Sequence, residues 1–476
     1  MLTLLKDYFK NRMKKIGVIL FFIFSFTGVK NSYAQTWDSV GGGVKGESKD
    51  HSFVAYGISS LCVYNGNLYA GGNYDTVANT IITHGLSQWN GTSWDTIKMG
   101  GEEAAALLVY NGNLVALGYC PSLINVGQYI GQWNGSNWNS LGEGIQTSGQ
   151  NGADLYALAQ YNGDLYATGS FLSPFYRGIA KWNGSSWDSL PEQHSLYGNG
   201  QNGIYTMVEY NGKLYAGGRF NSNGISNIAA WNDTAWSAVG AGVSGYGLSG
   251  VVVALAVYNG KLYAGGYFDS AGGKPAKSIA VWDGNIWSAL GSGVDSGGVY
   301  ALGVYNNVLV AGGAFDTAGG IACSNIAQWK DTTWSAMGKG IKGSKKEGVG
   351  INTLCVYNGY LYVGGQFDSA GGIHVNNIAR WGSPPSDTIK NYSGPFMIYP
   401  NPSKGIYTVQ IPTASGPTTI KIYNVLGQEI NSTLLIPTPG ADFEINLSNY
   451  SAGIYPYRVT AANGSILGQG KLIIQK

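Results

Sequence analysis

Short apolar runs separated by glycine-rich turns recur along most of the chain and predict β-strands. One example is the pair of runs Val252–Tyr258 and Lys261–Phe268, which flank the turn Asn259-Gly260. Asn-Gly favours a type I′ turn, in which both central residues have positive φ, so the two runs form a β-hairpin. After a loop, Ser278–Trp282 and Ile286–Gly291 predict a second hairpin. The pattern therefore predicts a unit of four antiparallel strands.

This unit occurs seven times, at intervals of 46 to 52 residues. A tyrosine ends the first strand of each unit, at Tyr64, Tyr110, Tyr161, Tyr210, Tyr258, Tyr305 and Tyr357. A tryptophan ends the third strand, at Trp89, Trp133, Trp182, Trp231, Trp282, Trp329 and Trp381. One such sheet cannot cover both its faces, whereas sheets arranged radially cover one another.

The two ends of the repeated region favour a closed ring over an open array. The last unit stops at Trp381 without a fourth strand, and Trp37–Gly43 resembles a fourth strand with no unit before it. Residues 37–43 are therefore expected to complete the last sheet. The sequence predicts an all-β chain whose residues 35–383 form a seven-bladed β-propeller of about 28 strands.

Composition agrees with an all-β chain and excludes several other classes. Gly accounts for 74 of 476 residues and charged residues for 11%, against roughly 7% and about 25% in average soluble proteins. So much glycine destabilises helices but supplies tight turns. Collagen is excluded because no Gly-X-Y period exists, and a content of 44% hydrophobic residues excludes general disorder.

The N-terminal segment has the pattern of a secretory signal peptide. Basic residues precede the apolar run Ile16–Val29, and small residues precede Gln35, so cleavage is expected between Ala34 and Gln35. The alternative is a membrane anchor, although the run is shorter than the ~20 residues that span a bilayer. Met13 is an alternative start. After removal of residues 1–34 we expect no transmembrane segment.

Charge is distributed unevenly and argues against a nucleic-acid partner. The whole chain has a net charge of +2, but residues 1–34 hold six of its 28 bases and one of its 26 acids, which leaves a net charge of −3. Residues 35–383 carry 16 bases and 21 acids. Such a surface lacks the basic patch that phosphate neutralisation requires.

The repeat period ends at Pro384–Asp387, and a second module follows. Residues 384–395 are expected to form a linker and residues 396–476 a small β-sandwich. Its expected strands are Tyr407–Ile411, Thr419–Tyr423, Phe443–Leu447, Tyr455–Thr460 and Lys471–Ile474.

Two resemblances follow from these residues. Ala264-Gly265-Gly266, Trp282-Asp283 and Trp287 with Leu290 resemble the kelch repeat, with Leu117 and Thr168 replacing the first glycine in units 2 and 3. The C-terminal module resembles the type A C-terminal sorting domain of the Bacteroidetes type IX secretion system. The matching residues include Pro400, Asn401, Pro402, Gly427, Gly453 and Tyr455.

The second resemblance implies a route out of the cell. It implies that the type IX secretion machinery is a partner and that the propeller reaches the outer cell surface or the exterior after passing through the periplasm. It also implies removal of the module, followed by release or attachment to lipopolysaccharide. The alternative is a carbohydrate-binding or adhesion module of similar fold.

The candidate metal ligands are four histidines, which do not recur at one position of the repeat, and a set of acids, which do. Kelch propellers include a copper oxidase, but the histidines His51, His84, His194 and His374 stand at unrelated repeat positions, which favours scattered surface residues over a metal site. Acids that follow the second strand favour turn chemistry over a calcium ring. These are Asp75, Asp269, Asp316 and Asp368, with Asn221 at the same place.

Other recurring residues carry a functional and a structural interpretation. Asp-Ser or Asp-Thr followed by an apolar residue or Thr resembles the Bacteroidetes O-glycosylation motif, with turn chemistry as the alternative. It occurs at Asp38, Asp75, Asp95, Asp188, Asp233, Asp269, Asp316, Asp331, Asp368 and Asp387. Tryptophan pairs such as Trp89 with Trp94 are expected to fill blade interfaces rather than to stack on sugars. The cysteines, Cys62, Cys120, Cys323 and Cys355, are expected to be buried free thiols, with a Cys62–Cys355 disulfide as the alternative.

No catalytic constellation emerges, and we assign no catalytic, cofactor or metal residues. The sequence favours a monomeric, non-enzymatic exported propeller that binds a glycan or protein ligand through loops at one mouth. Ligand-binding residues are not assigned. The alternative is an extracellular carbohydrate-active enzyme, a lyase, hydrolase or oxidase, with its site in the mouth.

Overall fold

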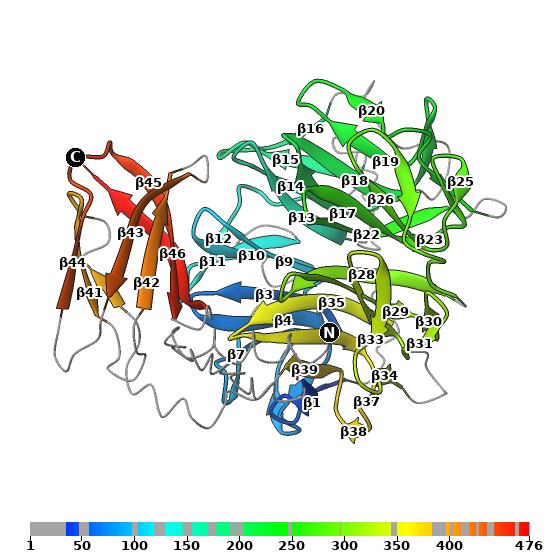
Figure 1. Cartoon of the computed structure of the whole chain (residues 1–476), viewed down its shortest axis with the longest axis horizontal. Coiled ribbons are helices and arrows are strands. Elements are labelled where there is room, and N and C mark those ends of the chain that lie inside the picture. Colours follow the sequence, from blue (N-terminus) through cyan, green and yellow to red (C-terminus); the bar gives the residue numbers. More distant parts are fainter. Residues whose placement is uncertain are drawn as a thin grey trace, which may run out of the picture. The chain divides into compact units, whose positions relative to one another are not determined.

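Every element in the described part of the chain is a β-strand (Figure 1). The computed structural model describes residues 35–46, 57–97, 103–118, 129–145, 155–169, 178–190, 196, 203–245, 250–295, 297–343, 350–382, 397–399, 403–410, 418–424, 428–435, 442–461 and 466–475.

The described residues between 35 and 382 form seven four-stranded antiparallel sheets, one for each sequence repeat. The sheet of repeat 1 contains β3 (Gly57–Tyr64), β4 (Asn67–Asn73), β7 (Leu86–Trp89) and β8 (Trp94–Thr96). The sheet of repeat 2 contains β9 (Ala106–Tyr110), β10 (Asn113–Leu117), β11 (Ile130–Trp133) and β12 (Trp138–Ser140). The sheet of repeat 3 contains β13 (Leu155–Tyr161), β14 (Asp164–Gly169), β15 (Ile179–Trp182) and β16 (Trp187–Ser189). The sheet of repeat 4 contains β17 (Gly203–Tyr210), β18 (Lys213–Ser222), β19 (Ile225–Trp231) and β20 (Trp236–Ala238). The sheet of repeat 5 contains β22 (Val251–Tyr258), β23 (Lys261–Tyr267), β26 (Ile279–Trp282) and β27 (Trp287–Ala289). The sheet of repeat 6 contains β28 (Gly298–Tyr305), β29 (Val308–Ala314), β32 (Ile326–Lys330) and β33 (Thr333–Ala336).

The seventh sheet joins the two ends of the repeated region. Its strands are β35 (Gly350–Tyr357), β36 (Tyr360–Gln366), β39 (Ile378–Gly382) and β1 (Thr36–Ser39). Trp37 pairs with Trp381 across β1 and β39, and their rings are 5.1 Å apart, much like Trp282 and Trp287 at 5.4 Å. The expectation that an N-terminal strand completes the last sheet is confirmed. The strand is shorter than the expected 37–43, because Gly41, Gly42 and Gly43 have positive φ.

The first hairpin of each repeat folds as its sequence predicts. Seven asparagines that follow the first strand have φ between 45° and 49°, namely Asn65, Asn111, Asn162, Asn211, Asn259, Asn306 and Asn358. The next residue also has positive φ, which is the type I′ geometry. In repeat 6 this residue is Asn307 rather than glycine.

Small sheets between neighbouring repeats are an addition that the sequence pattern did not predict. In one, β21 (Val243–Ser244), which follows repeat 4, pairs with the hairpin β24 (Ser270–Ala271) and β25 (Lys274–Pro275) of repeat 5. Gly272 and Gly273, both with positive φ, form its turn. The other short strands are β2 (Val44–Lys45), β5 (Thr76–Val77), β6 (Ile81–Ile82), β30 (Thr317–Ala318), β31 (Ile321–Ala322), β34 (Ile341–Lys342), β37 (Ser369–Ala370) and β38 (Ile373–His374).

Successive sheets share hydrophobic cores. Each core combines residues of two neighbouring repeats, as where Val252 and Leu262 of repeat 5 join Tyr210 and Ile228 of repeat 4. First strands contact one another in chain order, and β35 in turn contacts β3. The core between repeats 7 and 1 includes Ile58 with Tyr362. The seven sheets thus form a propeller-like all-β array.

The C-terminal module contains two sheets around a core of its own. One contains β40 (Met397–Tyr399), β41 (Ile406–Gln410) and β44 (Asp442–Asn446), and the other contains β43 (Glu429–Leu435), β42 (Thr418–Tyr423), β45 (Gly453–Ala461) and β46 (Ile466–Ile474). The five expected strands are present, β46 begins earlier than expected, and β40 and β43 were not predicted. Within the described residues no helix has the length and apolar character needed to cross a membrane.

Candidate functional site

The first strand of each repeat has two ends, which we call the hairpin end and the bulge end. At the hairpin end stands the repeated tyrosine that precedes the Asn turn. Its hydroxyl donates a hydrogen bond to a turn carbonyl of the next repeat, for example Tyr110 to Gly163 at 2.9 Å. Equivalent bonds join Tyr161 to Gly212, Tyr210 to Gly260, Tyr258 to Asn307, Tyr305 to Gly359 and Tyr357 to Gly66. The last of these connects repeat 7 to repeat 1.

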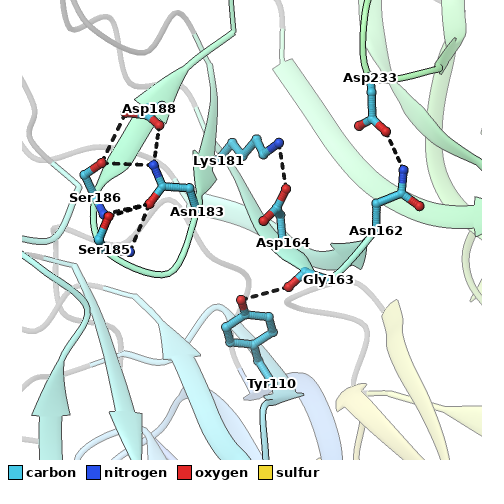
Figure 2. A network of polar contacts seen from close by, with 10 residues as sticks. All are labelled: Tyr110, Asn162, Gly163, Asp164, Lys181, Asn183, Ser185, Ser186, Asp188 and Asp233. Carbon is cyan, nitrogen blue, oxygen red and sulfur yellow. Dashed lines mark hydrogen bonds and ion pairs between the residues drawn. The ribbon is translucent and has the colours of Figure 1, made fainter.

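Polar side chains near the hairpin end are engaged with one another (Figure 2). Lys181 lies 2.6 Å from Asp164, and this hydrogen bond raises the pKa of the lysine. Asn162 in the turn of repeat 3 donates to Asp233 in repeat 4. The hairpin end therefore contributes mainly to joining the repeats.

In the turn between the third and fourth strands, an Asn or Asp side chain adds hydrogen bonds to the backbone bond that closes the turn. In repeat 3, Asn183 Oδ1 accepts from the backbone N–H groups of Ser185 and Ser186, and its Nδ2 donates to Asp188 at 2.7 Å (Figure 2). The Oδ1 atoms of Asn90, Asn134, Asn232 and Asp283 likewise accept from two backbone N–H groups in their repeats. The sequence Asn-Gly-Ser/Thr at Asn90, Asn134 and Asn183 is therefore explained by turn geometry rather than by N-glycosylation.

At the bulge end the first strand contains one residue more than the strand beside it. In repeat 1, Ile58 pairs with Gly72 and Ser60 with Gly71, so Ser59 has no partner. Such a bulge turns its extra side chain away from the strand's regular alternation. The half-buried bulge residues are Ser59, Tyr156, Tyr205, Val253, Tyr300 and Asn352.

The second glycine of each Gly-Gly pair makes room for the bulge. A Cβ on Gly266 would collide with the carbonyl oxygen of Val251, immediately before the bulge of the same sheet. Gly72, Gly118, Gly218, Gly313 and Gly365 face the equivalent carbonyl in their sheets. The first glycine serves another purpose, because a Cβ on Gly265 would overlap Val299 of the next sheet. Only the second glycine is present in all seven repeats.

Two bulge tyrosines from adjacent repeats form an aromatic pair. The rings of Tyr156 and Tyr205 have centroids 4.8 Å apart and meet at 74°, an edge-to-face arrangement. A Cβ on Gly203, two residues before Tyr205, would come within 3.0 Å of both rings. Glycine at the start of β17 therefore allows both rings to lie directly against the backbone.

A second pair joins repeats 5 and 6. Tyr267, the last residue of β23, contacts the bulge residue Tyr300, with centroids 5.3 Å apart and the two hydroxyls hydrogen-bonded. Gly298 again leaves space for both rings. Tyr267 is 44% exposed. Burial and the bond to Tyr267 raise the pKa of Tyr300, so its hydroxyl stays protonated.

Apart from the bulge residue Val253, the other residues at the bulge end are polar or small. Asn352 donates to the backbone carbonyl of Ile58 at 3.2 Å and so helps to join repeats 7 and 1. Arg219 is exposed and occupies in repeat 4 the register position that Tyr267 has in repeat 5. Glu103, at the start of repeat 2, is 8% exposed. The bulge end thus combines aromatic faces with a few polar groups.

The structure does not gather the candidate metal ligands. Among the described residues, no three His, Cys, Asp or Glu side chains come together as a metal site. His84 and His374 are exposed, and His51 and His194 lie outside the described residues. The backbone carbonyls of Asp75, Asp269, Asp316 and Asp368 accept hydrogen bonds within their own hairpin loops.

The tryptophan pairs fill contacts between sheets, as expected. Trp287 is buried, and its indole N–H donates to the carbonyl of Val239 in the preceding repeat at 2.8 Å. Trp94, Trp187 and Trp334 make the same bond. Trp37 does so as well, to Met337 at 2.8 Å, and thereby takes this position for repeat 7.

Cys62, Cys323 and Cys355 are free thiols in the structure, and Cys120 lies outside the described residues. Burial raises the pKa of Cys62 to about 11 and that of Cys355 to about 12, the neighbouring Cys62 adding to the shift of Cys355. Burial also raises the pKa of Cys323 to about 11.

Aspartates of the possible O-glycosylation motif make local contacts. Asp38 accepts from Arg380 Nε at 3.0 Å, Asp95 accepts from the backbone of Thr96, and Asp188 is bound by Asn183. Asp387 lies outside the described residues. Glycosylation at these positions stays a prediction.

The expected processing and sorting residues are described only in part. Ala34, Pro400, Asn401, Pro402 and Gly427 lie outside the described residues, and Gln35 is the first described residue. In the last sheet, Gly453 begins β45, and the Tyr455 hydroxyl donates to the carbonyl of Ser451 at 2.8 Å. Tyr455 packs in the core of the module.

This C-terminal module corresponds to a known family. Residues 397–475 match the secretion system C-terminal sorting domain. This domain marks proteins that the type IX secretion system exports, so the chain reaches the cell surface or the extracellular space. The expected interaction with the type IX machinery follows from the sorting domain. No curated protein sequence matches the chain.

Solved structures give only distant likenesses. PorZ, a surface component of the type IX secretion system of Porphyromonas gingivalis, is 14% identical with a TM-score of 0.46, and the match covers 88% of this chain and 59% of PorZ. The extracellular domain of BT3049, a putative hybrid two-component system of B. thetaiotaomicron, is 11% identical with a TM-score of 0.46, over 92% of this chain and 57% of that one. A copper-bound fungal alcohol oxidase of the AA5 family is 12% identical with a TM-score of 0.31, over 91% and 100%. At these scores the likenesses assign no activity to this chain.

Sequence reasoning missed the bulge tyrosines. Tyr161 and its equivalents are the same in every repeat, whereas the position of Tyr156 is Tyr in three repeats and Ser, Ala, Val or Asn in the other four. The signal that was available is this variation at a position five residues before the repeated tyrosine.

Proposed function

We propose that this chain is an exported, non-enzymatic binding protein whose ligand site lies at the bulge end of a closed seven-bladed propeller. In this proposal residues 1–34 are a signal peptide removed after Ala34, residues 35–383 are the kelch-like propeller, residues 384–395 are a linker and residues 396–476 form the sorting domain. The mature protein is a monomer. Its ligand is a glycan or a protein at the cell surface or outside the cell.

Three kinds of contact between repeats 7 and 1 support ring closure. Tyr357 donates to Gly66, in the same way that Tyr110 and Tyr305 bond to the repeat that follows each of them. Asn377 Nδ2 donates to Val44 as Asn227 does to Val243. Thr353 Oγ1 accepts from the backbone of Leu61, and Ser60 Oγ accepts from Leu107 in the following pair. Repeats 7 and 1 thus contact each other through the same positions as neighbours along the chain.

The observation that carries the binding function is the in-phase bulge. It turns a side chain out of the regular alternation at the same end of the first strand in six described repeats, and this side chain is Tyr in three of them and Ser, Val or Asn in the others. Positions that hold the sheets together, such as the hairpin-end tyrosine, are the same in every repeat. A diverse set of side chains on a rigid, uniform framework is typical of a binding site.

The function is tested with the secreted protein, purified after export by a competent host. It is applied to printed oligosaccharides and to a panel of extracellular proteins, and each oligosaccharide is also incubated with the protein and analysed for products. Saturable binding without products is the expected result. Turnover of an oligosaccharide that is abolished in Glu103→Gln would overturn the proposal in favour of an enzyme, and the absence of any ligand would also overturn it.

A further inference from the structure

The tyrosines at the bulge end lie on contiguous repeats. Tyr156 belongs to repeat 3, Tyr205 to repeat 4, Tyr267 to repeat 5 and Tyr300 to repeat 6. They form two contacting pairs, each of which bridges two sheets. Because the pairs occupy equivalent ends of neighbouring first and second strands, all four rings are at the bulge end. We call this set the tyrosine arc.

The arc is rigid and accessible at the same time. Tyr267 is 44% exposed, and the bulge tyrosines Tyr156, Tyr205 and Tyr300 are half-buried. Each pair is fixed by its ring contact and rests on a glycine, Gly203 or Gly298, where a side chain would collide with the rings. Prepositioned rings lose little side-chain entropy when a ligand binds, which lowers the cost of binding.

The surroundings of the arc distinguish between kinds of ligand. Two sets of described residues surround the arc: the bulge residues, and the second-strand residues that pair with the first residue of each first strand. Arg219 is the one basic residue in these two sets. A polyanion would therefore find little positive charge to neutralise its own. The exposed aliphatic residues of the first strands, Val63, Val257, Val304 and Val356, stand next to the hairpin-end tyrosine instead. At the bulge end of these strands the one aliphatic bulge residue among the described repeats is Val253, which is half-buried, so the rings provide most of the apolar surface there.

A sugar ring matches what is present. A pyranose has a face of C–H groups, which packs on an aromatic ring, and an edge of hydroxyls, which exchange hydrogen bonds with polar groups. Tyrosine offers both an apolar face and a hydroxyl. We propose that the tyrosine arc is an oligosaccharide-binding site in which sugar rings stack on Tyr267 and on the Tyr156–Tyr205 pair. This inference rests on the proposed binding function and names its ligand class.

The test uses the secreted protein and the oligosaccharide that gives the strongest signal on a printed oligosaccharide array, with affinity measured by calorimetry. Tyr267→Ala removes the most exposed ring and is expected to weaken binding about tenfold. Tyr267→Phe retains the stacking face and should bind within about threefold of the wild type. Tyr156→Ala tests the other pair and should also weaken binding about tenfold.

Val304→Ala is the matched control, because Val304 is a partly exposed side chain of a first strand at the opposite end. Its affinity should equal that of the wild type, and thermal unfolding of every variant verifies the fold. Equal affinity of wild type, Tyr267→Ala and Tyr156→Ala would overturn the inference while leaving the binding function intact. Binding to a protein of the extracellular panel, with no oligosaccharide bound, would overturn it in the same way. Failure to bind either class would overturn the proposed function itself.

Discussion

The two ends of the first strands differ in how the seven repeats use them. At the hairpin end every repeat has the same tyrosine, and its hydroxyl bonds to the neighbouring repeat wherever such a bond is described, as from Tyr305 to Gly359. At the bulge end the corresponding residues are Ser, Ala, Tyr, Val or Asn. One end is uniform because it joins the sheets. The bulge side chain is free to vary because the glycine of the second strand, such as Gly266, makes room for the backbone at that end.

This difference shows where to look for function in a repeated chain. Repetition amplifies structural residues, so the residues most visible in the sequence, such as Trp282 and Tyr258, are those that hold the sheets together. A functional residue is more easily found where a rigid framework position changes identity between repeats. The bulge of repeat 6, where Tyr300 stands, is such a position.

The largest effect is expected from removing the space that the bulge needs. In Gly266→Ala the new Cβ would collide with the carbonyl of Val251, so backbone must shift in the middle of a sheet. We expect a loss of about 3 kcal/mol in the free energy of unfolding, measured by denaturant titration.

Gly273→Ala is the control for this substitution. Gly273 has a φ of 74° but no atoms within 4 Å of an added Cβ, so only backbone strain is added, at a cost of about 1 kcal/mol. If Gly266→Ala cost no more than Gly273→Ala, the bulge would not depend on this glycine, and the contrast between the two ends would lose its structural basis.

Much of this framework could be predicted from residues with strong local preferences. Asn259-Gly260 predicts a type I′ hairpin by itself, and Trp37 fits the tryptophan position that the last repeat lacks. The hairpin β24–β25 was missed because each strand has only two residues on either side of Gly272-Gly273, too few to show alternation.

The bulge was missed for a different physical reason. Val252-Val253-Ala254 is uniformly apolar, so nothing in the run shows that Val252 and Ala254 pair with adjacent residues of the next strand and leave Val253 out. Consequently the sequence also does not reveal that Tyr156 and Tyr205, 49 positions apart along the chain, meet as a ring pair. The candidate site arises from a register shift, which depends on the folded sheet.

The next effect concerns the thiols, which stand two residues before the hairpin-end tyrosine. Because burial raises the pKa of Cys62 to about 11 from an ordinary 9.0, about a hundredfold fewer molecules carry the thiolate at pH 8. Alkylation of Cys62 by iodoacetamide at pH 8 should be about a hundredfold slower than alkylation of a cysteine peptide. The pKa of Cys355 is higher, so its alkylation should be slower still.

Peptide mapping by mass spectrometry measures both rates and separates these sites from Cys120. Guanidinium chloride should restore peptide-like rates, because the thiols then lose their burial. Alkylation of Cys62 in the folded protein at the rate of the cysteine peptide would show that this thiol is exposed to solvent. The hairpin end of β3 would then not be tightly packed. A Cys62–Cys355 disulfide in the same map would contradict the free thiols.

The smallest effect is expected when one tyrosine hydroxyl is removed at each end of the first strands. Tyr305→Phe removes the bond from a buried tyrosine to Gly359 at the hairpin end, and the free energy of unfolding should fall by about 1 kcal/mol. Tyr267→Phe removes a hydroxyl from a residue that is 44% exposed at the bulge end, where water replaces the lost bond, so the change should stay below about 0.5 kcal/mol. Ligand affinity should depend on the other tyrosine. Tyr305→Phe should bind the ligand as the wild type does, and any loss of affinity should be found in Tyr267→Phe. Equal destabilisation by the two substitutions would mean that the bulge-end tyrosines are framework residues as well, since their hydroxyls would then contribute to joining the repeats.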